Sequence, residues 1–208
     1  MNKRLLILIG GGSGSGKTTL VNLIKKKFKK ITVISTDFFY KDFSSIPPNQ
    51  REKINFDHPD SLDFELMRNT IKSLLSGKEV RIPIYDFKTH TRLRKKRRIV
   101  PSKIIVVEGI FALLDKEINK LADLRIFVET DDDIRLIRRI LRDMKERGRS
   151  LDSIIEQWIK HVKPMHEKFI EPSRKEAHLI IPEDPEGRMR EVAVESIIGI
   201  IERLIKQS

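Results

Sequence analysis

The chain has 208 residues, of which 39% are hydrophobic and none is cysteine. This length is sufficient for one globular domain with a sizeable core, and the lack of cysteine excludes disulfides and thiolate metal sites. A formal net charge of +12 is compatible with nucleic-acid binding, but the basic residues are dispersed along the chain, which favours charged helix faces and an anionic substrate instead.

The N-terminal stretch MNKRLLILIGGG places basic residues before an apolar run, as a signal peptide does. The apolar run is too short, however, and it leads into a glycine loop rather than a cleavage site. No apolar run in the chain is long enough to span a bilayer. We therefore expect a buried strand at residues 4–10, no membrane partner, and a cytoplasmic protein.

A glycine-rich loop follows this strand and precedes a helical pattern. It contains Gly11-x-x-x-x-Gly16-Lys17-Thr18, the P-loop pattern in its expected context. Backbone N–H groups of such a loop and the helix N-terminus face phosphate oxygens. The lysine bridges the β- and γ-phosphates, and the hydroxyl of the next residue binds Mg²⁺. The residues predicted to bind ATP are consecutive: Gly11, Gly12, Ser13, Gly14, Ser15, Gly16, Lys17, Thr18 and Thr19.

Four more apolar runs at 31–35, 103–109, 124–130 and 178–182 read as buried strands, and helical patterns lie between most of them. Buried parallel strands that alternate with helices predict an α/β fold. The fold class expected is a P-loop NTPase-type parallel sheet covered by helices on both faces, with a small β-hairpin insertion and a helical lid. We expect one domain over residues 1–208.

Carboxylates follow two of these strands at the edge where open α/β sheets bind ligands. Glu108 closes its strand and is predicted to contribute to the magnesium site, although it could cap the next helix instead. Asp37 lies just beyond the second strand. It could accept a proton from a hydroxyl, hold a magnesium-bound water, or make a local N-cap or Asx turn, and its position alone leaves these roles open.

Residues of about 47–101 interrupt the alternation of strand and helix. A helix at about 60–76 ends at Gly77, and the segments EVRIPIYD and RRIVP could pair as a hairpin. We expect substrate specificity to lie in this insertion. The basic run RLRKKRR at 92–98 is either an exposed hairpin tip or a site for an anion.

The segment DDDIRLIRRILRDMKERGRS predicts a helix that ends near Gly148. Ile134, Ile137, Leu141 and Met144 recur at helical spacing and are expected to form its buried stripe. The arginines on the other faces are either solvated and ion-paired, or belong to a lid at about 135–160 that stabilises the charge of a transferred phosphoryl group. The P-loop favours the lid.

The chain contains no guanine-reading NKxD segment and is short for a motor or helicase, so a small-molecule kinase fits best. Over nearly its whole length it resembles the uridine kinase (uridine–cytidine kinase) family. The segments that carry this resemblance, besides the P-loop, are STDFFY, NFDHPDSLD, IPIYDFKTHTR, VVEGIFAL, TDDDIRLIRRILRD, ERGRS and VKPMHEKFIEPSRKEAHLIIP.

The resemblance implies a role for each matching position. Asp37 would be the general base and a metal-site residue together with Thr18 and Glu108, and Lys17, Arg142 and Arg147 would act on the phosphates. In the nucleoside site that the resemblance implies, Tyr85 and Phe87 would flank the base and His90 would hydrogen-bond to its edge. Asp57 would accept hydrogen bonds from the ribose hydroxyls. The residues implied to bind the nucleoside are Phe56, Asp57, Tyr85, Phe87, His90, Arg139, Arg149 and Gln157.

The implied reaction is ATP-dependent phosphorylation of the 5′-hydroxyl of uridine or cytidine with Mg²⁺, by a homo-oligomer that is a tetramer in many family members. Ser150 and Trp158 depart from the family pattern, and PEDPEGR at 182–188 corresponds to it only loosely, so no adenine contact is assigned. Two alternatives stay open. The basic run at 92–98 could receive a phosphate already present on a phosphosugar acceptor, and the net charge keeps a nucleic-acid-binding ATPase in consideration.

Overall fold

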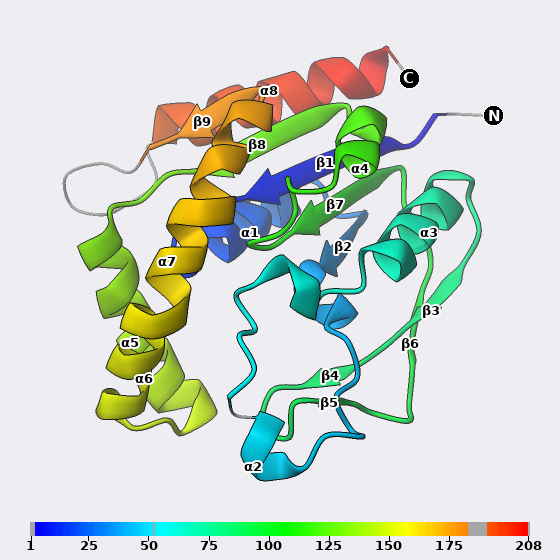
Figure 1. The fold of residues 1–208 in the computed structure, drawn as a ribbon. Coiled ribbons are helices and arrows are strands. Elements are labelled where there is room, and N and C mark those ends of the chain that lie inside the picture. The colour runs from blue at the N-terminus through cyan, green and yellow to red at the C-terminus, as the bar shows by residue number, and fades with distance from the viewer. Residues whose placement is uncertain (1–2, 52, 183–190, 208) are drawn as a thin grey trace.

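The computed structural model describes residues 3–51, 53–182 and 191–207. Its centre is a five-stranded parallel sheet with the strand order β2-β7-β1-β8-β9 (Figure 1). This sheet confirms the α/β class and all five predicted strands, whose bounds are Leu5–Gly10 (β1), Ile31–Ser35 (β2), Ile104–Glu108 (β7), Leu124–Val128 (β8) and Leu179–Ile181 (β9).

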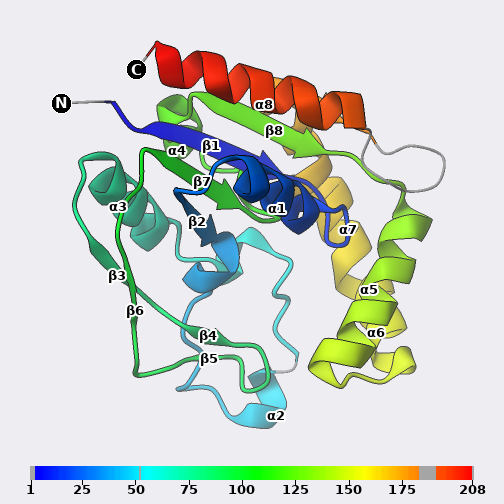
Figure 2. The same cartoon turned by 180° about the vertical axis from the view of Figure 1, so that it is seen from behind.

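Helices cover both faces of the sheet, and short 3₁₀ and π-helical turns connect several of them (Figures 1 and 2). The α-helices are Lys17–Lys27 (α1), Pro48–Arg51 (α2), Phe64–Leu75 (α3), Lys116–Leu121 (α4), Asp132–Arg147 (α5), Leu151–Gln157 (α6), Lys163–Met165 (α7) and Glu191–Lys206 (α8). The turns are Thr36–Phe39 (η1), Pro59–Ser61 (η2), Trp158–Val162 (η3), His166–Ile170 (η4) and Glu171–Glu176 (η5).

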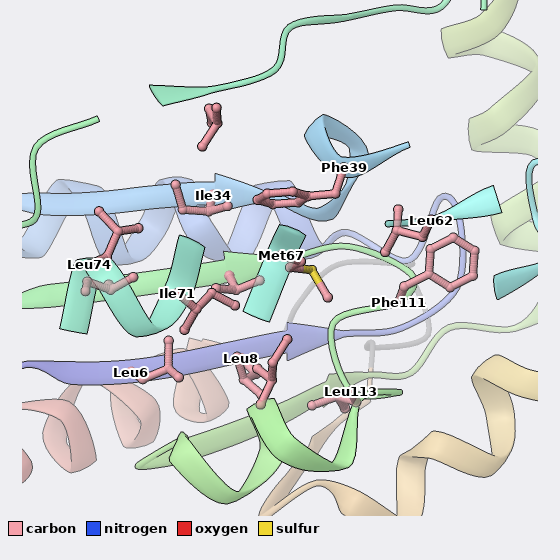
Figure 3. Close-up of a cluster of buried hydrophobic side chains, with 14 of the residues drawn as sticks. Leu6, Leu8, Ile34, Phe39, Leu62, Met67, Ile71, Leu74, Phe111 and Leu113 are labelled. Atoms are coloured by element: carbon pink, nitrogen blue, oxygen red, sulfur yellow. The ribbon is translucent and has the colours of Figure 1, made fainter. Parts of the chain in front are cut away.

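The two faces of β1 contribute to two separate hydrophobic cores, because successive side chains of a strand point to opposite sides. Leu6 and Leu8 pack with α3 and α4, as Figure 3 shows for α3. Leu5, Ile7 and Ile9 pack with α1 and α8 on the other face. All five side chains are at most 1% exposed, so β1 is a rigid support for the loop that follows it.

The insertion contains a two-stranded arm beside the sheet, formed by residues 80–99 (Figure 2). The predicted hairpin is confirmed as β3 (Val80–Ile82) paired with β6 (Arg97–Ile99), and a second pair, β4 (Tyr85–Asp86) with β5 (Thr91–Arg92), was not predicted. Arg92 ties the arm to the main body, because its Nε donates to the carbonyl of Tyr40 at 2.7 Å and its Nη2 lies 3.2 Å from Asp63 Oδ2.

The predicted helix near the lid is confirmed as α5, which ends at Gly148 in the left-handed conformation (φ 65°). The predicted buried stripe is wrong. Ile137, Leu141 and Met144 are 53%, 66% and 49% exposed, and Ile134 is only partly buried, whereas Arg135, Arg139 and Asp143 are buried. The reason is that α5 packs its polar face against the P-loop, as shown by the hydrogen bond from Arg139 Nη1 to Ser13 Oγ at 3.2 Å.

Among the described residues, no helix combines the length and the apolar character needed to cross a membrane.

Candidate active site

The carboxyl ends of β1, β2 and β7 bring three chemical features to one edge of the sheet. β1 leads into the P-loop, β2 leads into the turn that carries Asp37, and β7 ends at Glu108. The parallel register places Ser35 and Ile9 on either side of Glu108. Residues more than seventy positions apart along the chain are therefore fixed beside one another by backbone hydrogen bonds.

The P-loop encloses the ammonium group of Lys17. Nζ donates to the carbonyl oxygens of Gly12 at 2.6 Å and Gly11 at 3.0 Å. Gly14 has φ +84°, and a side chain there would begin 2.6 Å from the carbonyl oxygen of Arg135, so only glycine fits. Burial lowers the pKa of Lys17 to about 8, against the attraction of Glu108 and Asp37.

Asp37 and Glu108 form a partly buried acidic pair whose charges act on Lys17. Burial raises the pKa of Asp37, although Arg147 and Lys17 oppose the shift. Burial also raises the pKa of Glu108, where Lys17 lowers it and the charge of Asp37 raises it further. Ser35 Oγ accepts a hydrogen bond from the backbone N–H of Asp37, so Asp37 is not itself the cap of this turn and its carboxylate is available to the cavity.

A single cavity of about 1340 Å³ connects the P-loop to the insertion and to α5 and α6. Gly11, Gly12 and Thr19 do not line it. Every other residue predicted for the site does: Ser13, Gly14, Ser15, Gly16, Lys17, Thr18, Asp37, Phe56, Asp57, Tyr85, Phe87, His90, Glu108, Arg139, Arg142, Arg147, Arg149 and Gln157.

The end of the cavity away from the P-loop is aromatic. The rings of Phe56 and His90 are stacked with centroids 4.2 Å apart and an interplanar angle of 12°. Tyr85 and Phe87 meet edge to face at 5.4 Å, and Tyr40 lies 5.1 Å from Tyr85. Flat apolar rings beside polar edges suit a planar heterocycle better than an open-chain sugar.

Asp57 and Asp86 are the acidic residues that line the cavity near these rings, and Asp57 is the one whose pKa is raised. Burial raises its pKa, while Arg139, His161 and Arg149 oppose the shift. A partly buried carboxylate near guanidinium groups can accept hydrogen bonds from vicinal hydroxyls while the guanidinium groups balance its charge.

Four arginines, here called the lid arginines, line the cavity from α5 and from the turn that follows it: Arg139, Arg142, Arg147 and Arg149. Arg139 contacts Ser13 of the P-loop and Gln157 of α6, at 3.2 and 3.3 Å. Arg149 donates to the same oxygen of Gln157 at 2.6 Å. The guanidinium of Arg147 lies 4.8 Å from the centre of the Phe87 ring, a cation–π contact that joins the lid to the arm.

The donor set near the P-loop suits a hard cation that is bound together with a nucleotide. No group of three or more histidine or acidic side chains that could hold a metal ion occurs within the described ranges. Mg²⁺ beside phosphates needs only one or two carboxylates and a hydroxyl. Thr18, Asp37 and Glu108 supply that set, and burial of two carboxylates favours a cation beside them.

Several lining residues were not identified from the sequence. Tyr40 could have been found, because it belongs to the same STDFFY segment as Asp37, whereas Lys53, Glu146 and His161 give no sequence signal. The basic run at 92–98 does not line the cavity. Arg92 anchors the arm, Arg98 pairs with Glu79, and Arg97 lies over the Phe38 ring at 5.1 Å.

A P-loop at the edge of a parallel sheet, in one cavity with an aromatic pocket and an arginine-rich helix, defines a P-loop phosphotransferase. The sequence model of the phosphoribulokinase/uridine kinase family matches residues 6–190, and the chain belongs to that family.

Curated relatives match along the whole chain. A protein named uridine kinase from Clostridium novyi (strain NT) is 45% identical over 210 residues, with 100% of both chains covered. Another of that name from Streptococcus gordonii is 47% identical over 209 residues, which cover 100% of this chain and 98% of the relative.

Solved structures agree at the level of the fold. Phosphoribulokinase from Rhodobacter spheroides has a TM-score of 0.65 at 18% identity, with 88% of this chain and 71% of that chain covered. D-glycerate 3-kinase from Cryptococcus neoformans has a TM-score of 0.66 at 16% identity, with 91% and 89% covered.

Proposed function

We propose that the protein is a nucleoside kinase that transfers the γ-phosphoryl group of ATP to the 5′-hydroxyl of uridine or cytidine, a step of pyrimidine salvage. One observation carries this proposal: a single cavity has a phosphate-binding loop at one end, an aromatic pocket with the partly buried carboxylate of Asp57 at the other, and Asp37 on its wall. The name of the curated relatives, uridine kinase, supports the same acceptor.

At the donor end, the P-loop backbone and Lys17 bind the triphosphate. At the acceptor end, Tyr85 and Phe87 pack against the pyrimidine faces and His90 hydrogen-bonds to its edge. Asp57 accepts hydrogen bonds from the 2′- and 3′-hydroxyls. A substrate that lacks the 2′-hydroxyl leaves part of this buried acceptor without a partner, at a cost of about 1–3 kcal/mol.

The reaction is an in-line displacement. The Asp37 carboxylate accepts the proton of the 5′-hydroxyl while that oxygen forms a bond to the γ-phosphorus, and the bond from the γ-phosphorus to the bridging oxygen of ADP breaks. Lys17, Arg142 and Arg147 stabilise the charge on the transferred group. Most of the rate enhancement comes from holding the two reactants in line, because positioning dominates phosphoryl transfer.

Mg²⁺ is the cofactor that we assign to Thr18, Glu108 and Asp37. When bound, it would neutralise charge on the β- and γ-phosphates. The two raised carboxyl pKa values fit this assignment, because a neighbouring dication stabilises the ionised form of both acids.

An ADP-release assay of the purified protein tests the function with uridine, cytidine, adenosine, deoxyuridine and ribulose 5-phosphate as acceptors. The expected result is turnover with uridine or cytidine, weaker use of deoxyuridine, and a 5′-monophosphate product identified by mass spectrometry. Turnover with ribulose 5-phosphate alone, or ATP hydrolysis that only polynucleotide stimulates, would establish one of the two alternatives.

The structure gives the phosphosugar alternative little support, because the basic run that suggested it lies on the arm and does not face the cavity. The net positive charge of the chain is the observation that supports the nucleic-acid alternative. It predicts binding of RNA or DNA that weakens steeply with salt, which a filter-binding titration would measure.

We assign the enzyme to the cytoplasm and expect a homo-oligomer. The exposed apolar side chains of Ile137, Leu141 and Met144 on α5 support association, because a second copy could cover them. Light scattering on the wild-type protein and on Leu141→Lys would show whether this face holds copies together.

A further inference from the structure

Asp143 is a completely buried carboxylate, at 0% exposure, in the middle of the lid arginines. Arg142 contacts its Oδ1 through both Nε and Nη2 at 2.8 Å. Arg147 Nη1 lies 3.4 Å from Oδ1, and Arg149 Nη1 and Arg139 Nε lie 3.5 and 3.6 Å from Oδ2. Four guanidinium groups therefore share one aspartate.

This cluster is ionised and not balanced in charge. Burial alone would raise the pKa of Asp143, but Arg142, Arg147 and Arg139 outweigh burial and leave the pKa below its ordinary value. Burial and the neighbouring guanidiniums lower the pKa of Arg147 and Arg149. Within this cluster the four guanidinium groups exceed the one carboxylate by three charges. All four arginines line the cavity, where the carboxylates of Asp37 and Asp57 also act on them.

The four arginines reach both ends of the cavity. Arg139 contacts Ser13 of the P-loop, and Arg147 lies over Phe87 of the arm. Arg139 and Arg149 also donate to Gln157 of α6. Through its arginine partners, Asp143 thus joins the donor side, the acceptor side and the second lid helix.

We propose that Asp143 is a positioning residue: a built-in counter-anion that holds the four lid arginines as one unit aimed at the transferred phosphoryl group. The positive charge of the four arginines on the cavity wall suits a polyphosphate, whose oxygens can accept the same hydrogen bonds as the carboxylate. The inference rests on the proposed function only in taking ATP as the polyphosphate, and it does not depend on the identity of the acceptor.

Two opposite effects follow from this arrangement. The carboxylate orients the guanidiniums, which favours turnover, and its negative charge opposes incoming phosphates, which weakens binding. Replacement of Asp143 by the isosteric amide removes both effects at once. Turnover should fall while polyphosphate affinity rises, a combination that mere damage to the lid would not produce.

The test compares wild type, Asp143→Asn and the control Asp152→Asn, which changes an exposed carboxylate at the start of α6. Calorimetry with pyrophosphate as the probe should show about tenfold tighter binding by Asp143→Asn, from one more uncompensated charge near the phosphates. With ATP and uridine, kcat should fall about 100-fold, as expected for misplaced catalytic groups. Asp152→Asn should match the wild type in both measurements.

Weaker pyrophosphate binding by Asp143→Asn, or an unchanged kcat, would overturn the proposal. If the wild type binds pyrophosphate but phosphorylates no nucleoside, the proposed function fails. The comparison of pyrophosphate affinities between wild type and Asp143→Asn still tests the role of Asp143 in that case.

Loss of the buried carboxylate removes the acidic side chain that directly contacts all four arginines and can prevent folding. The double variant Asp143→Asn/Arg142→Gln removes one charge of each sign. Its melting temperature should exceed that of Asp143→Asn if the aspartate acts as a counter-anion. A double variant less stable than the single one would contradict that role.

Discussion

Asp37 is the residue whose replacement tests the proposed chemistry most directly. In Asp37→Asn the side chain keeps its size and its place after β2 but can no longer accept the proton of the acceptor hydroxyl. The side chain is partly buried, and the charges of Arg147, Lys17 and Arg142 act on it. The other carboxylates that line the cavity are Asp57, Asp86, Glu108, Glu146 and Glu156.

A positioned general base typically contributes 10²–10⁴ to the rate, which corresponds to about 3–5 kcal/mol of transition-state stabilisation. We therefore expect kcat of Asp37→Asn to fall by at least about 100-fold. The dissociation constants of ATP and uridine should stay within about threefold, because the amide fills the same volume, and Thr18 and Glu108 remain at the site assigned to Mg²⁺.

The pH profile gives a second measurement of the same group. Burial raises the pKa of Asp37, and the active form is the carboxylate. The kcat/KM of the wild type should therefore decline with falling pH above the range of an ordinary aspartate, near pH 4. A steady-state ADP-release assay measures both effects. Asp37→Asn with turnover within threefold of the wild type would remove Asp37 from the mechanism.

Three further predictions follow from the same contacts. Asp57→Ala should raise the KM for uridine about 10–100-fold with little change in the KM for ATP, because it removes charge-assisted hydrogen bonds to ribose; equal weakening of both would argue against a ribose contact. Gly109→Ala should lower the free energy of unfolding by about 2–4 kcal/mol, since φ is +148° and the new Cβ would overlap Thr36 Oγ1; an unchanged urea midpoint would refute this. Burial and the charge of Arg135 lower the pKa of His166 from 6.5 to about 4, so the unfolded chain alone binds the proton between those values. Stability should fall by at most about 3 kcal/mol as the pH drops from 6.5 to 4. Urea titrations should show a smaller loss over this range for His166→Phe than for the wild type, and equal losses would refute the shift.

The sheet and its P-loop could be predicted because each is a local pattern. The apolar run of β1 and the spacing from Gly11 to Thr18 report their conformation without any knowledge of distant residues. The same holds for α5, whose C-terminal Gly148 has the positive φ that the sequence implies.

The burial of α5 could not be predicted because it depends on a partner that is distant in sequence. Hydrophobic periodicity assumes that the apolar face turns inward, but the surface available to this helix is the P-loop backbone, which is polar. Arg135 is consequently 1% exposed while Leu141 is 66% exposed. The role of Asp143 was missed for the same reason: one acidic residue among arginines resembles an ordinary surface ion pair.

The order of the strands has a consequence for how the protein is made. β1 and β2 are not hydrogen-bonded to each other, because β7 lies between them. During synthesis the first hundred residues emerge with two apolar strands whose inner edges have no partner, and the catalytic edge is assembled only after Glu108 has left the ribosome. Nascent chains halted before β7 should therefore be open to proteases and to chaperones, and protection should appear abruptly once that strand inserts.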